Sequence, residues 1–304
     1  MSQLISVVPN VCEGRDEAFI ESLREQLWGI PGLVVLDISM DQVRNRTVFS
    51  FTGRKDAIFE GGYLLYQAAI EHIDMRQHQG EYPRIGAVDV FPFVALRHAP
   101  LETAIAWSVE FAETVATRFQ LPVYLFAESA RNPLRRDIEN IREGEYEGFA
   151  AKITDPVWKP DFGPDVFPPE KGATIIGARM PIVNFKAYLN TPDEGAAEWV
   201  ASVLSNPATG MPGVHFYPAL DRNRNVALLN ITVGNYAETP LYRILEGVKT
   251  ELSRFGAGVS RVEMVGLVPQ TALLDSALHY LQVMGFTLED TVEHRLDSIL
   301  GEGA

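Results

Sequence analysis

The sequence predicts an α+β fold made of two similar α/β subdomains. Two observations support this prediction. Each half of the chain gives the order strand, helix, strand, strand, helix, strand, which is that of a split βαβ or ferredoxin-like unit. The chain is also long enough, at 304 residues, for two domains of ordinary size. We expect an N-terminal subdomain over residues 1–178, a C-terminal subdomain over residues 179–304, and a ligand groove between them.

In the first half, strands are expected where β-forming residues cluster before a Pro or Gly, and helices where apolar residues recur every four positions, as at Phe19, Leu23 and Leu27. These rules give a strand at 3–8, a helix at 15–28, strands at 33–38 and 46–52, a helix at 55–74 and a strand at 86–96. Beyond them we expect a helix at 102–119, a strand at 122–127 and a helix at 133–142.

The second half repeats the pattern without evident identity to the first. Thr191-Pro192-Asp193-Glu194 predicts a helix start, because it combines a capping-box pattern with Pro at the first helical position. The expected elements are a strand at 180–189, this helix, strands near 213–218 and 224–233, a helix from Thr239-Pro240 to about Phe255, a strand at 260–267, and two helices within 269–300.

Composition excludes some functions. The formal net charge of −14 argues against broad binding of nucleic acid or an anionic membrane, because phosphates would be repelled. The N-terminus lacks a signal-peptide pattern and no apolar run approaches a membrane span, so we expect a cytoplasmic protein. The single cysteine, Cys12, suggests a reducing compartment, and a partly buried Cys is a simpler interpretation than a nucleophile.

Metal and nucleotide signatures are not found in the sequence. It has no phosphate-binding Gly-rich loop, no His-Glu-x-x-His and no Cys pair, so we expect no metal and no nucleotide cofactor. The histidines show no compact ligand spacing; they are His72, His78, His98, His215, His279 and His294.

The densest polar run, residues 76–86, joins a long helix to an apolar strand. It contains His78, Tyr82 and Arg84, and it is either a site beside rigid elements or a solvated loop. Asp89 lies inside the apolar strand that follows, where a carboxylate needs a cationic partner. That partner is expected to be Arg84 or Arg46, in a structural or a substrate-orienting role.

Two further segments are candidates for the same site. Asp37 and Asn45-Arg46-Thr47 lie at strand edges, from which side chains can reach a shared cleft. The loop at 158–172 is long and rich in Pro, Gly and charge, and long structured loops in compact domains are often functional.

A series of short motifs runs along the chain. They are Val8-Pro9-Asn10, Glu13-Gly14-Arg15, Leu36-Asp37, Asn45-Arg46-Thr47-Val48, Ile73-Asp74-Met75, Gly80-Glu81, Pro83-Arg84-Ile85-Gly86-Ala87-Val88-Asp89-Val90, Pro122-Val123-Tyr124-Leu125, Ile141-Arg142, Gly144-Glu145-Tyr146, Pro160-Asp161-Phe162-Gly163-Pro164, Gly172-Ala173-Thr174, Gly177-Ala178-Arg179 and Val265-Gly266-Leu267-Val268-Pro269. With these motifs the chain resembles the formiminotransferase domain of glutamate formiminotransferases over essentially its whole length.

The resemblance implies a function. That family moves a formimino group from formiminoglutamate to tetrahydrofolate, and some members exchange formyl between 5-formyltetrahydrofolate and glutamate. It implies tetrahydrofolate as substrate or acceptor, a glutamate derivative as second substrate, folate in a groove between two subdomains, and a homodimer. The implied catalytic residues are Tyr82, His78 and Asp37. The implied folate- and substrate-binding residues are Asn45, Arg46, Arg84, Asp89, Asp161, Phe162, Gly163, Pro164, Gly172, Arg179, Asn230 and Glu263.

Three departures from the family pattern bear on this function. Tyr82 stands where the family carries its acid/base histidine, and a tyrosine is a poorer base at neutral pH. Asn184 is shifted by one position in its strand, and Val226-Ala227-Leu228 replaces a polar pattern. His78 is a candidate to take over the base role. The alternatives to an active transferase are a folate-binding paralogue without turnover and a transferase with a more apolar substrate.

Overall fold

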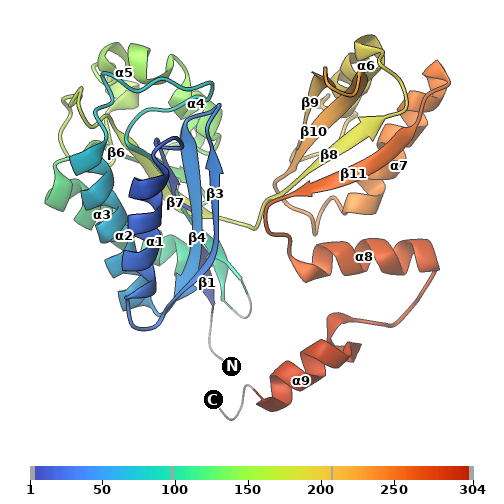
Figure 1. The fold of residues 1–304 in the computed structure, drawn as a ribbon, viewed down its shortest axis with the longest axis horizontal. Helices are drawn as coiled ribbons and strands as arrows, with labels where there is room; N and C mark the ends of the chain where they lie inside the picture. Colours follow the sequence, from blue (N-terminus) through green and yellow to red (C-terminus); the bar gives the residue numbers. More distant parts are fainter. Residues whose placement is uncertain (1–3, 97–98, 207, 301–304) are drawn as a thin grey trace. The chain divides into compact units, whose positions relative to one another are not determined.

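The computed structural model describes residues 4–96, 99–206 and 208–300, and it divides into two compact units, Met1–Met180 and Pro181–Ala304. Each unit has its own sheet, its own helices and its own hydrophobic core (Figure 1). The predicted mixture of helices and strands in two sheets is confirmed. In the described part of the chain, no helix is long and apolar enough to cross a membrane.

The sheet of the first unit has seven strands. They are β1 (Ile5–Val7), β2 (Asn10–Val11), β3 (Leu33–Asp41), β4 (Arg46–Gly53), β5 (Val88–Ala95), β6 (Val123–Ala127) and β7 (Thr174–Arg179). Their order is β1-β4-β2-β5-β7-β6, and β3 pairs with β4 outside this path. Pairing is antiparallel from β1 to β5, whereas β7 runs parallel to both β5 and β6.

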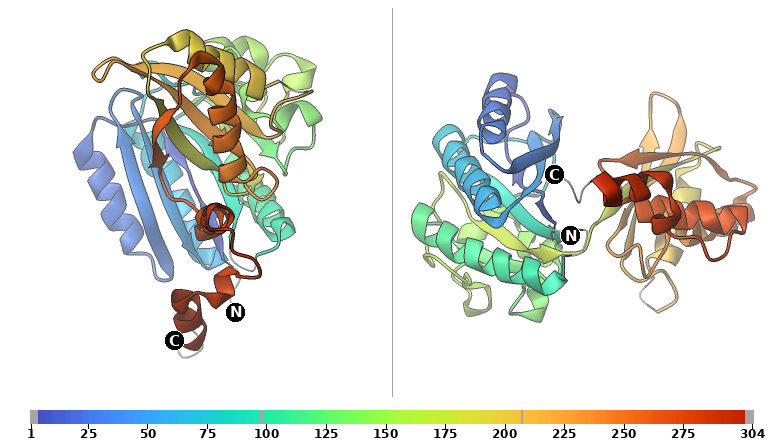
Figure 2. Two further views of the ribbon diagram at one scale, coloured as in Figure 1. Left: turned by 90° about the vertical axis from the view of Figure 1, so that its right-hand side faces the viewer. Right: turned by 90° about the horizontal axis from the view of Figure 1, so that it is seen from below.

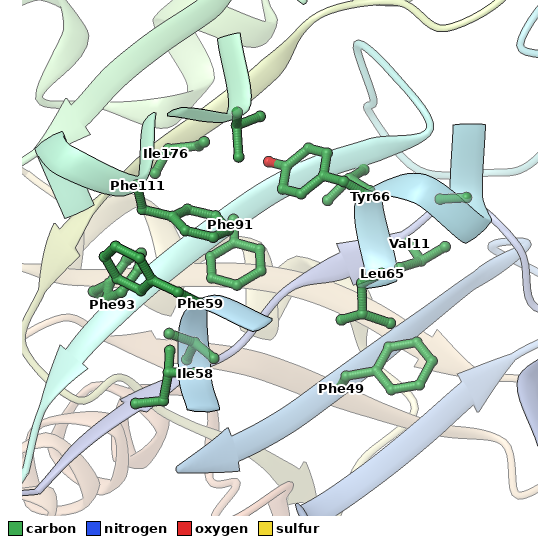
Figure 3. Close-up of a cluster of buried hydrophobic side chains, with 14 of the residues drawn as sticks. Val11, Phe49, Ile58, Phe59, Leu65, Tyr66, Phe91, Phe93, Phe111 and Ile176 are labelled. Carbon is green, nitrogen blue, oxygen red and sulfur yellow. The ribbon is translucent and has the colours of Figure 1, made fainter. Parts of the chain in front are cut away.

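Three long helices cover one face of this sheet: α1 (Glu17–Trp28), α2 (Lys55–His72) and α3 (Leu101–Phe119). Figure 2 shows this layer from two further sides. The core beneath it is rich in aromatic rings, and the ring of Phe111 lies 4.6 Å from that of Phe91 and 5.1 Å from that of Phe59 (Figure 3). Gly62 of α2 leaves room for this packing, because a Cβ there would lie 2.5 Å from Phe111 Cζ.

A smaller cluster lies on the opposite face, beside β5, β6 and β7. It brings Tyr124 and Ile175 of the sheet against Ile141 and Phe149. The last two belong to the short helices α4 (Ile138–Arg142) and α5 (Glu145–Lys152), and the turns η1 (Pro133–Arg135) and η2 (Pro156–Trp158) flank these helices. This packing holds α4 and α5 beside the chain that enters β5.

The second unit contains one antiparallel sheet of four strands in the order β11-β8-β10-β9. Alternate residues of its strands, such as Phe185 and Ile231, pack with α6 and α7 into one core. Its elements are β8 (Val183–Leu189), α6 (Glu194–Leu204), β9 (Val214–Asp221), β10 (Val226–Val233), α7 (Leu241–Leu252), η3 (Ser253–Phe255), β11 (Val259–Val265), α8 (Gln270–Leu281), η4 (Leu288–Asp290) and α9 (Val292–Leu300).

Several predicted boundaries are wrong. The strand predicted at 180–189 begins only at Val183, and the strand before it, β7, and the helix α5 were not predicted. The strand predicted at 3–8 is observed as β1, Ile5–Val7, and the short strand β2, which was not predicted, follows it after Val8-Pro9, since a proline has no N–H for the ladder. Gln3 lies outside the described residues. The predicted cap of α6 is also shifted, because the side chain of Asp193 accepts from the N–H of Gly195.

Candidate functional site

The turn between α2 and β5, residues 73–87, holds three polar residues of the candidate site, His78, Tyr82 and Arg84. It passes close to a neighbouring turn at Gly80, where a Cβ would lie 2.2 Å from the carbonyl oxygen of Arg44. Asn45, which has a φ of +48°, lies in that neighbouring turn. The side chain of Asn45 accepts from Gly14 N at 2.9 Å and donates to the Gln79 carbonyl at 3.0 Å. Asn45 therefore ties three segments of the chain together.

Both ring nitrogens of His78 are engaged. Its Nε2 lies 3.0 Å from the Asn45 carbonyl oxygen, and its Nδ1 lies 3.3 Å from Arg84 Nε. Since a guanidinium only donates, Nδ1 is the acceptor and Nε2 carries the hydrogen, which makes His78 a neutral imidazole. Burial lowers the pKa of His78, and the charge of Arg84 adds to this, against the opposing effect of the Asn45 carbonyl.

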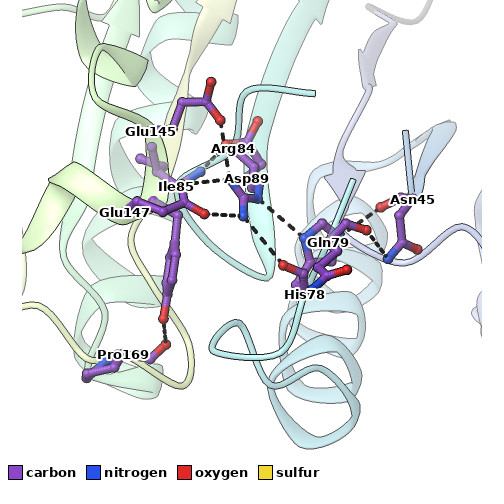
Figure 4. A network of polar contacts seen from close by, with 10 residues as sticks. Asn45, His78, Gln79, Arg84, Ile85, Asp89, Glu145, Glu147 and Pro169 are labelled. Atoms are coloured by element: carbon purple, nitrogen blue, oxygen red, sulfur yellow. Dashed lines mark hydrogen bonds and ion pairs between the residues drawn. The ribbon is translucent and has the colours of Figure 1, made fainter. Parts of the chain in front are cut away.

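Arg84 is the hub of a polar network (Figure 4). Its Nη1 and Nη2 donate to the two oxygens of Glu147 at 2.9 and 2.6 Å, and Nη1 also lies 3.2 Å from Glu145. The hydrogen bond from Arg84 lowers the pKa of Glu147. A cavity of about 540 Å³ opens beside this network, lined by His78, Gln79, Gly80, Arg84, Gly144, Glu145 and Glu147.

Tyr82 lies between two arginines. The guanidinium carbon of Arg46 is 3.8 Å from the centre of the Tyr82 ring, and that of Arg142 is 5.2 Å from it. Arg142 Nη1 also lies 3.4 Å from the Tyr82 hydroxyl oxygen. Within the described part of the chain, the guanidinium of Arg46 has no hydrogen bond and no carboxylate partner, and its Nε is buried.

The buried carboxylate of Asp89 pairs with Arg142, so the predicted partners Arg84 and Arg46 are wrong. Arg142 Nη2 donates to one oxygen of Asp89, and the other oxygen accepts from Ile85 N at 2.9 Å. The two side chains are 1% and 4% exposed. Burial by itself lowers the pKa of Arg142, but the charge of Asp89, its hydrogen bond and the nearby Tyr82 and Glu139 together outweigh burial, so the pKa lies above its ordinary value.

Two of the contributing residues were missed as site residues from the sequence, Arg142 and Glu147. Both come from the segment of α4 and α5, more than fifty positions from the turn that they contact, with separations of 60 residues to Tyr82 and 63 to Arg84. The position of Asp89 within an apolar strand indicated from the sequence that its carboxylate needs a cationic partner. Nothing in local spacing selected Arg142 among the arginines of the chain.

The loop at 158–172 is held by its own contacts. The Asp161 carboxylate accepts from Arg135 Nη1 at 2.6 Å and from Leu125 N at 2.9 Å, and both side chains are 6% exposed. The Phe162 carbonyl accepts from Val123 N, and its ring lies under Arg131. The next residues, Gly163 and Pro164, follow this anchor, and Gly163 has a φ of +84°.

Three further predicted residues lie on or next to the strands β3 and β7 of the first sheet. Gly172 has a φ of +75° and bridges Gly86, beside the turn that carries Tyr82. Asp37 is opposite Ser50 in the ladder between β3 and β4, and Arg179, the last residue of β7, donates to the carbonyl of Met180 at 3.0 Å.

The thiol of Cys12 is buried, and burial together with the Asp89 charge raises its pKa, so it is no nucleophile.

The remaining predicted residues, Asn230 and Glu263, lie in the second unit. Both flank Lys186, which is opposite Asn230 in β10 and opposite Glu263 in β11. Lys186 Nζ is 3.5 Å from Glu263. Asn184 and Thr232 share a hydrogen bond of 2.8 Å on the same face. This face of the sheet, opposite the core, therefore carries a row of polar side chains.

Metal ligands do not cluster in the described residues, where no group of three or more His, Cys, Asp or Glu side chains could hold an ion. Of the six histidines, His98 lies outside the described residues.

Comparison with known proteins places this site in context. Residues 4–179 match the family model described as the N-terminal subdomain of the formiminotransferase domain, and residues 216–297 match the formiminotransferase domain. The chain is 34% identical to a glutamate formimidoyltransferase of Streptococcus pyogenes over 94% of this chain and 96% of that protein. It is 35% identical to one of Thermoplasma acidophilum over 97% of each. It is 34% identical to the formimidoyltransferase-cyclodeaminase of Rattus norvegicus, over 97% of this chain and 56% of that protein.

Proposed function

This chain belongs to the formiminotransferase family, and on that premise we propose that it is a folate-dependent transferase that moves a formimino group from formiminoglutamate to tetrahydrofolate. Formyl exchange between 5-formyltetrahydrofolate and glutamate is the related reaction of the same site. The observation that carries the proposal is the identity of 34% and 35% to two proteins named glutamate formimidoyltransferase, over nearly the full length of each.

We propose Tyr82 as the proton-transfer residue, in the position of the family's histidine. When an amine of tetrahydrofolate attacks the formimino carbon, the bond from that carbon to the glutamate nitrogen breaks. The Tyr82 hydroxyl gives its proton to the departing nitrogen, and the attacking amine, which has become cationic, returns a proton to the phenolate. The engagement of both His78 nitrogens supports Tyr82 over His78 in this role, because His78 would have to give up Arg84 before it could accept a proton.

Arg46 is the best candidate for the substrate carboxylate. Its guanidinium stacks on the Tyr82 ring and, among the described residues, has no carboxylate partner. Arginine binds carboxylates through paired hydrogen bonds, so a substrate held there would lie beside the Tyr82 hydroxyl. Arg84, by contrast, already binds the carboxylate of Glu147, and Asp161 already binds the guanidinium of Arg135. We propose that Arg84 holds the turn at 73–87 in place and that Asp161 holds the loop at 158–172.

Folate contacts are proposed for both units. In the first they come from Asp37, Asn45, Phe162 and Arg179 together with the backbone at Gly163, Pro164 and Gly172; in the second, from Asn230 and Glu263. Support for the second set comes from their shared face on the four-stranded sheet. The order β8-α6-β9-β10-α7-β11 and the strand order β11-β8-β10-β9 support a ferredoxin-like fold for the second subdomain. The boundary at residue 178, the homodimer and the cytoplasmic location stay predictions.

The test is turnover of the purified protein with each donor, measured by mass spectrometry of the products. We expect transfer by the native chain, a loss of about 100-fold or more in kcat for Tyr82→Phe, and activity at or above the native level for Tyr82→His. If neither formiminoglutamate nor 5-formyltetrahydrofolate gave a transfer product, the proposal would be rejected. Heat of tetrahydrofolate binding without turnover, with activity restored by Tyr82→His, would identify a folate-binding paralogue instead.

A further inference from the structure

A buried ion pair, between Asp89 and Arg142, contacts Tyr82 through the guanidinium of Arg142. Asp89 is on β5 and Arg142 ends α4, and neither belongs to the cavity beside Arg84. One guanidinium nitrogen of Arg142 donates to Asp89, and the other lies 3.4 Å from the Tyr82 hydroxyl. This contact is long, as catalytic hydrogen bonds often are before a substrate binds.

The direction of the hydrogen bond has a chemical consequence. A guanidinium has donors only, so in this contact the Tyr82 oxygen accepts and Arg142 donates. The phenolic hydrogen then cannot point toward Arg142 and is left for an acceptor on the other side. Within the described residues no other partner of the Tyr82 hydroxyl is present.

We infer that Arg142, held by Asp89, is a positioning residue that orients the Tyr82 hydroxyl so that its hydrogen faces the substrate. The inference rests on the function proposed above. Asp89 fixes Arg142 because its second oxygen is held by the Ile85 amide, which belongs to the turn that carries Tyr82. Arg46 on the ring restricts the plane of Tyr82, and Arg142 restricts the hydroxyl.

An arginine fits this role better than a lysine. The planar guanidinium reaches Asp89 with one nitrogen and Tyr82 with another, whereas a lysine has one ammonium at the end of a flexible chain. Arg142→Lys therefore keeps the charge beside Asp89 and loses the simultaneous contact. Glu139→Gln is the matched control, because Glu139 is an exposed carboxylate 3.9 Å from the same guanidinium and has no contact with Tyr82.

The test is a double-mutant cycle of Arg142→Lys and Tyr82→Phe, with kcat and KM for formimino transfer. Arg142→Lys alone should lower kcat by about 10-fold or more with little change in KM. In the Tyr82→Phe background, which lacks the hydroxyl, the same change should alter kcat by no more than about 2-fold. Equal losses in both backgrounds would show a merely structural role and overturn the inference.

A second readout does not need activity. Tyrosine labelled with ¹³C at ring Cζ gives one NMR signal for each residue, and the signal lost in Tyr82→Phe is that of Tyr82. This signal should move in Arg142→Lys and stay in place in Glu139→Gln, with thermal melts to confirm that both variants fold. An unmoved Tyr82 signal in folded Arg142→Lys contradicts the inference, whatever the assays show. A moved signal without turnover leaves the inference standing and rejects only the proposed function.

Discussion

His78 shows how a single residue near the site couples protonation to the fold. Its neutral form is required, because Nδ1 accepts from Arg84 Nε, and burial lowers its pKa below the ordinary value of about 6.5. The unfolded chain therefore binds a proton at a higher pH than the folded chain. As pH falls through about 6.5 toward the folded pKa, the free energy of unfolding should decrease, and it should be unaffected by His78 at higher pH.

Urea unfolding at a series of pH values between about 5 and 8 measures this slope. We expect His78→Gln to flatten it, because the residue that titrates is removed. His215→Gln is the control, since His215 lies on β9 and its side chain is exposed. If His78→Gln and His215→Gln changed the slope equally, His78 would not be the coupled group.

At the scale of single residues, the sequence shows that a buried charged group must be paired more reliably than it shows which residue pairs with it. The apolar surroundings of Asp89 showed that its carboxylate must be paired, and that was correct. The partner, Arg142, lies 53 positions away and is brought in by the packing of α4 on the sheet, which no local pattern records. The stacking of Arg46 on Tyr82 has the same cause, because the two residues meet only when two turns pack together.

At the scale of elements, the junction of the Tyr82 turn with β7 depends on Gly172. It has a φ of +75°, and a Cβ there would lie 2.2 Å from the Ile85 carbonyl oxygen, which also accepts from Ala173 N. We expect Gly172→Ala to lower the free energy of unfolding by about 2 kcal/mol or more. It should also reduce activity, because a shift of Ile85 would disturb the hydrogen bond from the Ile85 amide to Asp89.

Gly148→Ala is the matched control for this prediction. Gly148 lies in α5, and no atom would come within 4 Å of a new Cβ. Alanine should raise helix stability there by about 0.5–1 kcal/mol. Chemical denaturation of both variants measures the difference, and a Gly172→Ala protein as stable as the Gly148→Ala protein would show that the close contact relaxes without cost.

The strand β7 was missed for a physical reason. It is a central parallel strand, buried on both faces, so its residues 174–179 do not alternate between apolar and polar. It also contains Gly177, which packs against the Phe126 carbonyl and reads as a loop signal in the sequence. The antiparallel strands of the second unit have one open face, alternate clearly, and were predicted close to their observed positions.

For the whole molecule, the excess of acidic side chains is the feature with the broadest consequence. The chain has 40 Asp and Glu residues against 26 Lys and Arg residues, which gives the net charge of −14, and its isoelectric point is near 4.9. Mutual repulsion opposes the compact state, and salt screens it over a Debye length of about 10 Å at 0.1 M. We therefore expect the melting temperature at neutral pH to rise by a few degrees, in calorimetry, between about 10 and 150 mM NaCl.

The charge origin of this effect can be separated from ion binding. Choline chloride should act like sodium chloride at the same ionic strength, because screening depends on charge and not on the identity of the cation. Near pH 5, close to the isoelectric point, the dependence on salt should largely disappear, since little net charge is left to screen. A melting temperature that is independent of salt at neutral pH would mean that local ion pairs, such as the one between Asp89 and Arg142, balance the repulsion, and that the excess charge does not limit stability.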